Sequence, residues 1–209
     1  MHPEEELVRF CNRCGAEVEA KIPPGEDRDR PVCSSCGFVS YVNPKIVVGC
    51  VVEHRDDILL CRRAIEPARG KWTLPGGYLE LHESAIDGAV RETFEEARAR
   101  VEVFAPHAFL DVPNISQMYA IFRAHFVELE YDAGPESLEV RLFDPKDIPW
   151  DELSFPVVDF ALRLWEDDRR AGRHDVHVGV VRWNGEGSRY DSKEYSLEGH
   201  IATPVVVGS

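Results

Sequence analysis

The alternation of apolar and polar residues predicts several β-strands in the middle of the chain. Residues 45–53 and 58–62 are rich in Val, Ile and Leu, and the polar residues 54–57 predict a hairpin turn between them. Further β-rich runs cover residues 101–108, 117–129 and 139–143. Strands that precede and follow a helical segment predict an α/β sandwich.

Two stretches carry apolar residues at helical spacing. In the first, the recurring positions are Ile86, Ala89, Val90 and Ala97, and Ser84 is placed to cap the helix. In residues 156–170 the apolar positions recur in the same way, which predicts a second helix packed on the sheet.

The first helix also concentrates acidic residues on its other face. Glu92, Glu95 and Glu96 are three and four positions apart, so a helix brings their carboxylates together. Such like charges repel each other unless a cation lies over them, and oxygen ligands suit a hard divalent cation. The preceding Pro-Gly-Gly turn, which ends at Gly77, lets backbone approach a ligand closely. An acid-rich solvated helix face is the simpler alternative, but it does not account for the turn.

Four of the six cysteines form two Cys-X-X-Cys-Gly motifs, at Cys11, Cys14, Cys33 and Cys36. This spacing is typical of a zinc ribbon, in which four thiolates surround one zinc ion. Disulfides are the alternative, but nothing else in the sequence indicates an oxidising compartment. Cys50 and Cys61 lie within apolar runs and are predicted to be buried, inert thiols.

Composition narrows the class of partner. The 209 residues carry a formal net charge of −14, which disfavours broad contact with a nucleic-acid backbone. We expect no nucleic-acid or membrane partner, because no apolar run approaches membrane-spanning length and the first residues lack a signal-peptide pattern. A cytoplasmic location is the default expectation. In residues 1–45 acids outnumber Lys and Arg, which favours a structural or dimerising role for the ribbon.

Three segments are predicted. Residues 1–44 form the zinc ribbon, residues 45–183 the main domain, and residues 184–209 a polar, Gly-containing C-terminal extension. The apolar run 204–207 predicts a strand or a contact between subunits.

The region from Gly77 to Glu96 resembles the Nudix box. The required residues of that motif match at the required spacing, as Gly77, Glu83, Arg91, Glu92, Glu95 and Glu96. Three positions depart from it: Arg98 and His82 stand where relatives have glycine, and Thr93 replaces an aliphatic residue. These departures are expected to alter the loop geometry rather than the chemistry.

The resemblance extends beyond the box. Residues 41–50, 74–80 and 134–143 are similar to zinc-ribbon Nudix hydrolases of the FAD and ADP-ribose pyrophosphatase type. This implies a Nudix α/β/α sandwich with a mixed sheet, preceded by a ribbon with structural Zn²⁺. It also implies a homodimer that cleaves the diphosphate linkage of a small nucleoside diphosphate derivative, giving FMN and AMP from FAD, or AMP and ribose 5-phosphate from ADP-ribose.

The same resemblance assigns roles to the box residues. It implies that Glu92, Glu95 and Glu96 bind Mg²⁺ or Mn²⁺, with the Gly77 carbonyl as a further ligand. Glu83 can complete the cluster, and Arg91 is expected to orient the glutamates.

The general base and the substrate contacts stay open. The base is either a box glutamate or a later one, Glu136 or Glu139, and we include Glu139 among the predicted catalytic residues. The predicted substrate-binding residues are Arg62, Arg63, Glu80 and Tyr78, with a role as solvated or core residues as the alternative. Further aromatic candidates are Trp72, Phe109 and Tyr119.

Two other functions compete. An NADH pyrophosphatase also joins a ribbon to a Nudix box, but its Ser-Gln-Pro-Trp-Pro-Phe-Pro-type run is replaced here by Leu-Asp-Val-Pro-Asn-Ile-Ser-Gln at 110–117. A ligand sensor that keeps the fold without catalysis is the second alternative, which the complete set of box acids disfavours.

Overall fold

A computed structural model describes residues 8–205 of the chain. The chain falls into two compact units, one up to Pro44 and the other from Lys45. The first unit is a small antiparallel hairpin of β1 (Val18–Lys21) and β2 (Arg30–Cys33). Within the described residues, no helix combines the length and the apolar character needed to cross a bilayer.

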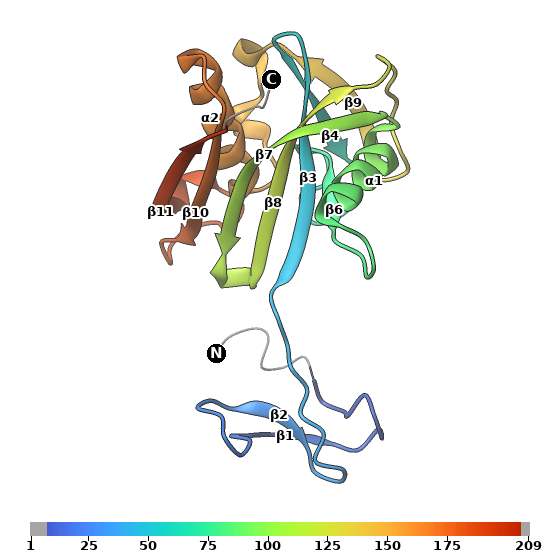
Figure 1. Ribbon diagram of the computed structural model, residues 1–209, viewed down its shortest axis with the longest axis vertical. Coiled ribbons are helices and arrows are strands. Elements are labelled where there is room, and N and C mark those ends of the chain that lie inside the picture. The colour runs from blue at the N-terminus through green and yellow to red at the C-terminus, as the bar shows by residue number, and fades with distance from the viewer. Residues whose placement is uncertain (1–7, 206–209) are drawn as a thin grey trace. The chain divides into compact units, whose positions relative to one another are not determined.

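The second unit is built on one mixed sheet of nine strands (Figure 1). Its strands are β3 (Lys45–His54), β4 (Asp57–Arg63), β5 (Trp72–Thr73), β6 (Gly76–Tyr78), β7 (Val101–Val112), β8 (Gln117–Phe126), β9 (Ser137–Phe143), β10 (Asp175–Trp183) and β11 (Tyr195–Pro204). The order along the sheet is β11-β10-β7-β8-β3-β4-β5, with β6 paired to β3 and β9 to β4. The pairs β3–β8 and β7–β10 are parallel and the others are antiparallel.

Helices cover both faces of the sheet. Helix α1 (Ala85–Ala97) packs on one face and α2 (Pro156–Ala171) on the other, and short 3₁₀ turns cover Pro113–Ile115, Pro145–Asp147, Trp150–Glu152 and Ser192–Glu194. The strands supply both cores by alternation, because successive side chains point to opposite faces. Leu59 and Cys61 belong to the core under α1, whereas Ile58 and Leu60 belong to the core under α2. The predicted α/β/α sandwich with a mixed sheet is confirmed.

Both helices, the hairpin turn and the strands β3, β4, β7, β8 and β9 lie where the pattern predicts them, whereas the pattern does not predict β10. Two positions of α1 also differ from expectation. Ile86 is exposed, and the buried face of α1 includes Thr93 instead. The Thr93 hydroxyl donates a hydrogen bond to the Ala89 carbonyl at 2.8 Å, so this departure from the box pattern leaves no unpaired polar group.

The end of the chain differs most from expectation. Residues 195–204 form β11, which pairs with β10 along the edge of the main sheet, so most of the predicted extension is part of the main unit. Residues 206 and 207 of the predicted apolar strand lie outside the described residues.

Candidate active site

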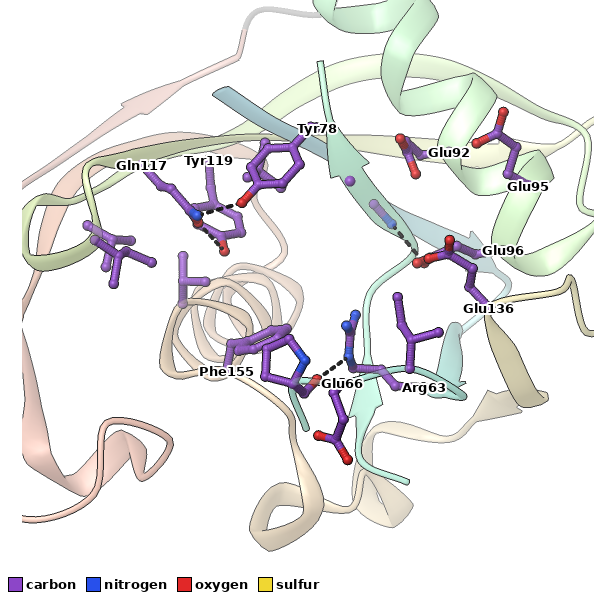
Figure 2. Close-up of a pocket in the computed structure, with 18 of the residues that line it drawn as sticks. Arg63, Glu66, Tyr78, Glu92, Glu95, Glu96, Gln117, Tyr119, Glu136 and Phe155 are labelled. Atoms are coloured by element: carbon purple, nitrogen blue, oxygen red, sulfur yellow. Dashed lines mark hydrogen bonds between the residues drawn. The ribbon is translucent and has the colours of Figure 1, made fainter. Parts of the chain in front are cut away.

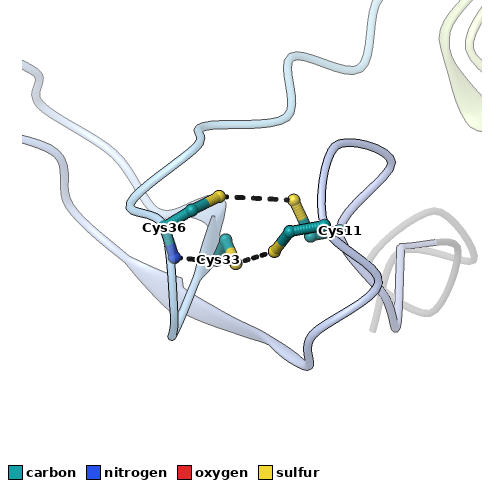
Figure 3. A group of neighbouring side chains, drawn as sticks. Cys11, Cys33 and Cys36 are labelled. Carbon is teal, nitrogen blue, oxygen red and sulfur yellow. Dashed lines mark hydrogen bonds between the residues drawn. The ribbon is translucent and has the colours of Figure 1, made fainter.

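The four ribbon cysteines converge within the first unit. Their Sγ atoms lie within 4.8 Å of one another, and those of Cys11 and Cys36 are 3.8 Å apart (Figure 3). That separation is far longer than a disulfide bond, and the four thiols are unpaired. The backbone N–H of Cys36 donates to Cys33 Sγ, and this hydrogen bond lowers the pKa of the Cys33 thiol to about 6. Four convergent sulfurs with backbone donors fit a structural zinc ion.

In the second unit, a capped helix presents the box acids. Ser84 is the N-cap of α1, where its hydroxyl accepts a hydrogen bond from the Asp87 N–H at 3.1 Å. His82, just before the cap, has a φ of 71°, in the left-handed region that favours glycine. The predicted capping is confirmed, and it sets the start of the helical register on which Glu92, Glu95 and Glu96 lie.

Arg91 holds three of the acids in place. Its guanidinium donates to both carboxylate oxygens of Glu83, at 3.0 and 2.7 Å, to Glu92 at 2.7 Å and to Glu95 at 3.1 Å. A further N–H donates to the Tyr78 carbonyl. Because Arg91 pairs with both oxygens of Glu83, it lowers the pKa of that carboxyl to about 2. In this arrangement Glu83 orients Arg91, and Arg91 orients the other acids.

Glu96 and Glu92 are carboxylates withdrawn from water. Glu96 is 7% exposed and accepts a hydrogen bond from the Gly76 N–H at 3.1 Å. Burial raises the pKa of Glu96 to about 7 and also raises the pKa of Glu92. Glu95 is more exposed, at 56% of its side chain.

The backbone beside these acids leaves no room for a side chain. A β-carbon built on Gly77 would lie 2.5 Å from a carboxylate oxygen of Glu92. The site therefore brings three carboxylates of one helix to the same cavity, with a bare backbone segment against Glu92. This donor set fits a hard divalent cation, and the groups that could hold it are Glu92, Glu95, Glu96 and the Gly77 carbonyl.

The C-terminal end of α1 positions a fourth acid. Arg98 ends the helix with a φ of 52°, in the left-handed conformation that is usually held by glycine at a helix end. The Gly134 N–H donates to the Glu96 carbonyl at 2.9 Å, and a β-carbon on Gly134 would collide with the Glu95 carbonyl. This close packing, together with the hydrogen bond from the Ala64 N–H to the Glu136 carbonyl, brings Glu136 to the box acids (Figure 2).

The acids face a cavity of about 830 Å³. Of the predicted site residues, those that line it are Gly77, Tyr78, Glu80, Arg91, Glu92, Glu95, Glu96 and Arg63. Across the cavity from the carboxylates, Gln117 bridges two tyrosines, donating to the Tyr78 hydroxyl at 2.9 Å and accepting from the Tyr119 hydroxyl at 3.0 Å (Figure 2). The cavity thus has a carboxylate end and a hydrogen-bonded aromatic end.

Glu83 does not line this cavity and acts on it only through Arg91. Two further predicted residues, Arg62 and Glu139, also lie outside the lining. They face each other across β4 and β9, with 3.8 Å between Arg62 Nη1 and a Glu139 oxygen, and Arg62 also donates to the Gly70 carbonyl. Arg63 is the next residue along β4 and reaches the cavity instead, where its guanidinium lies 5.1 Å from the Phe155 ring centroid. Strand alternation separates the two arginines.

Among the aromatic candidates, Tyr78 and Tyr119 line the cavity, whereas Trp72 is buried in the core under α2 and Phe109 packs on the core under α1. The sequence reading missed several lining residues. Arg189, Tyr190 and Tyr195 come from the C-terminal extension, and Phe155 precedes α2. No motif marks them, since the segment around residue 189 is polar and rich in glycine.

Comparisons with known proteins agree with this geometry. Residues 43–161 match the family described as NUDIX domain, and residues 9–42 match the family described as Nudix N-terminal, the zinc ribbon of Nudix proteins. The fold is similar to the crystal structure of a NUDIX hydrolase from Nitrosomonas europaea, with a TM-score of 0.80 and 45% identity over 83% of this chain and 99% of that one.

Two curated relatives bear on the substrate. An ADP-ribose pyrophosphatase from Methanocaldococcus jannaschii is 25% identical over 125 residues, which cover 52% of this chain and 67% of that protein. An NAD-capped RNA hydrolase NudC from Pseudomonas aeruginosa is 26% identical over 180 residues, 85% of this chain. The match spans 57% of that relative's length.

Proposed function

Because the chain belongs to the Nudix hydrolase family, we propose that it cleaves the diphosphate linkage of a nucleoside diphosphate derivative, either ADP-ribose or FAD. The observation that carries the proposal is the set of Glu92, Glu95 and Glu96 on one cavity of about 830 Å³, where Arg91 holds Glu92 and Glu95 and the Gly76 N–H holds Glu96. A cavity of this size suits a small-molecule ligand.

The proposed cofactor is Mg²⁺ or Mn²⁺, held by Glu92, Glu95, Glu96 and the Gly77 carbonyl. Such an ion lowers the pKa of water and offsets the charge of phosphate oxygens. Hydrogen bonds within the protein hold these acids in place despite the repulsion between their charges. Glu83 and Arg91 fix their orientation, and the Gly76 N–H holds Glu96.

The remaining charged residues of the cavity suit the reaction. Glu136 lies close enough to Glu92 and Glu96 to raise the pKa of both carboxyls. We assign Glu136 as the general base that takes a proton from the attacking water, in place of Glu139. Arg63 lies on the cavity wall near Phe155, where its guanidinium can bind a phosphate oxygen of the substrate.

The aromatic end of the cavity suits a flat ring. Tyr78 is 49% exposed and Phe155 lies 6.4 Å from Tyr190, so aromatic faces from three segments surround the same space. Adenine and isoalloxazine both stack on such faces. The ADP-ribose pyrophosphatase relative supports ADP-ribose, and FAD is retained from the sequence resemblance.

Product analysis tests the proposal. The purified protein is incubated with Mg²⁺ and, separately, with FAD, ADP-ribose and NADH, with Glu95→Gln as the control. FMN plus AMP identifies an FAD pyrophosphatase, and ribose 5-phosphate plus AMP identifies an ADP-ribose pyrophosphatase. Absence of turnover on all three, from protein that still binds Mg²⁺, would reject these substrates and favour a sensor. Equal turnover by Glu95→Gln would remove Glu95 from the mechanism.

NADH is the second candidate, because the NudC relative aligns with 85% of this chain. We expect FAD or ADP-ribose to be cleaved faster than NADH. NADH turnover equal to or above the other two would overturn that order and would call for a test on NAD-capped RNA.

The domain organisation, the oligomeric state and the location of the protein are proposed as follows. We propose three functional segments, with a ribbon in residues 1–44, a catalytic domain in 45–183 and an extension in 184–209 that completes the cavity wall. A homodimer is proposed from the sequence resemblance, and a cytoplasmic location is kept as the default. Light scattering coupled to size-exclusion chromatography gives the oligomeric state.

A further inference from the structure

Three buried side chains capable of binding a metal meet on the face of the sheet that α2 covers, away from the box acids. They are His107 on β7, Asp168 on α2 and His177 on β10, and their exposed fractions are 0%, 0% and 1%. One potential ligand atom from each lies within 4.8 Å of the other two. This cluster has no part in the proposed hydrolysis.

His107 directs an unpaired nitrogen into the protein interior. Its Nε2 lies 2.9 Å from the Ala161 carbonyl of α2, and a carbonyl can only accept, so Nε2 carries the proton. Burial disfavours the doubly protonated ring, which leaves Nδ1 with a lone pair. Nδ1 is buried and has no hydrogen-bond partner. Histidine ligands of metal ions show the same arrangement, with the other ring nitrogen donating to a carbonyl.

The other two residues are equally fixed. His177 Nε2 lies 3.1 Å from Asp168 Oδ2, and His177 Nδ1 lies 3.0 Å from His200 Nε2 on β11. Asp168 Oδ1 accepts from Arg173 at 3.1 Å, and Oδ2 accepts from the Asp175 N–H at 2.9 Å. Asp168 Oδ2 and His177 Nε2 therefore face each other within the cluster and are hydrogen-bonded to one another.

A small cation fits between these atoms. Bonds of about 2.0–2.2 Å from zinc to nitrogen and oxygen place two ligand atoms about 3–4 Å apart. The observed Asp168–His177 distance is already in that range, and the spread to 4.8 Å requires only small side-chain movements. Two imidazoles and one carboxylate suit zinc and other first-row transition ions rather than Mg²⁺.

We infer that His107 Nδ1, His177 Nε2 and Asp168 Oδ2 form a second transition-metal site, zinc by preference, separate from the ribbon and from the box acids. Binding requires His177 Nε2 to give up its proton, which moves to Nδ1 of the same ring, so the imidazole stays neutral. His177 Nδ1 then donates to His200 Nε2, and His200 carries its own proton on Nδ1.

The site would brace the C-terminal hairpin. It connects α2, β7 and β10, and β10 pairs with β11. The segment that links these two strands carries Arg189 and Tyr190, which line the cavity. A metal bond here would therefore stabilise the part of the cavity that comes from the extension.

Cobalt binding distinguishes this site from the ribbon. Metal-free full-length protein is titrated with Co²⁺ in excess Mg²⁺, which occupies the box acids, and the titration is repeated in Glu95→Gln. Cobalt on four thiolates has an intense sulfur-to-metal charge-transfer band, whereas cobalt on nitrogen and oxygen has only weaker visible bands. We expect two equivalents per chain, one with the sulfur band and one without it.

The variants His107→Phe and His174→Gln form a matched pair, because His174 is an exposed histidine outside the cluster. His107→Phe is expected to lose the equivalent without the sulfur band and to keep the other, and His174→Gln to keep both. If His107→Phe fails to fold, the wild-type titration decides alone. One equivalent per chain, or a second one that His107→Phe retains, would overturn the site and leave a hydrogen-bonded histidine cluster without metal.

Discussion

The Cβ position of Gly77 lies 2.5 Å from a carboxylate oxygen of Glu92, so the backbone of β6 and the helix acid occupy adjoining space without a side chain between them. Arg91 donates a hydrogen bond of 2.7 Å to that carboxylate, so the Glu92 side chain cannot rotate away from a β-carbon at position 77 without losing this bond. Gly77→Ala should therefore displace Glu92 and lower kcat by about 10–100-fold, the usual cost of disturbing a metal ligand's support. Steady-state kinetics at saturating Mg²⁺ measure this effect.

The neighbouring glycine provides the control. A β-carbon on Gly76 would lie 2.6 Å from the Val48 carbonyl, which belongs to the backbone of the sheet and cannot rotate away. Gly76→Ala should lower the free energy of unfolding by about 1–3 kcal/mol, whereas Gly77→Ala should change it by less than about 1 kcal/mol. Urea unfolding of both variants tests this contrast, and equal destabilisation would contradict it.

Arg91 should control the metal requirement. Its planar guanidinium binds both oxygens of Glu83 and also reaches Glu92 and Glu95, a geometry that a lysine ammonium cannot reproduce. Arg91→Lys should raise the Mg²⁺ concentration for half-maximal activity by about 10–100-fold. Arg98→Lys, at the end of the same helix, is the control and should leave the Mg²⁺ requirement close to that of the wild type.

Glu136 and Glu139 should behave differently as candidate bases. Glu136 lines the cavity beside the box acids, and Glu139 faces Arg62 outside it. Glu136→Gln should lower kcat by about 10²–10⁴-fold, while Glu139→Gln should keep most of the activity. A large loss in Glu139→Gln with full activity in Glu136→Gln would return the assignment to Glu139.

The six thiols should divide into two classes. Chelation of ribbon zinc should expose Cys11, Cys14, Cys33 and Cys36 to a thiol reagent, and Cys11→Ser should abolish zinc binding there. Cys50 and Cys61 are buried and should react only after unfolding. A thiol assay should count no reactive thiols per chain in the native protein, four after chelation and six after denaturation. Six reactive thiols after chelation alone would show that zinc also holds the second unit together.

Burial of the Cys50 thiol should make the stability of the protein depend on pH. Desolvation raises the pKa of the Cys50 thiol from 9.0 to about 11, because the interior disfavours the thiolate. Below pH 9 the thiol is protonated in both states, so its contribution to stability is complete. Between pH 9 and 11 the unfolded chain ionises first, and stability falls. Cys50→Ala should reduce this loss in urea unfolding curves measured from pH 8 to 11.

Local sequence determined most of the fold and the acidic half of the site. Hydrophobic periodicity places the two helices and the strands β3, β4, β7, β8 and β9, because burial of one face imposes a period of 3.6 or 2 on the residues. It does not place β10 or most of β11. The spacing of Glu92, Glu95 and Glu96 likewise puts them on one side of α1 before any tertiary contact forms. The ribbon cysteines are determined in the same way, by short turns that bring paired thiols together.

Tertiary structure decided which of two neighbouring candidates reaches the cavity. Arg62 and Arg63 are alike in sequence, as are Glu136 and Glu139, but strand alternation and the packing of Gly134 on α1 bring Arg63 and Glu136 inward. The aromatic wall and the buried histidine cluster come from residues far apart in the chain. Their proximity depends on sheet order and on the docking of α2, which no local pattern encodes.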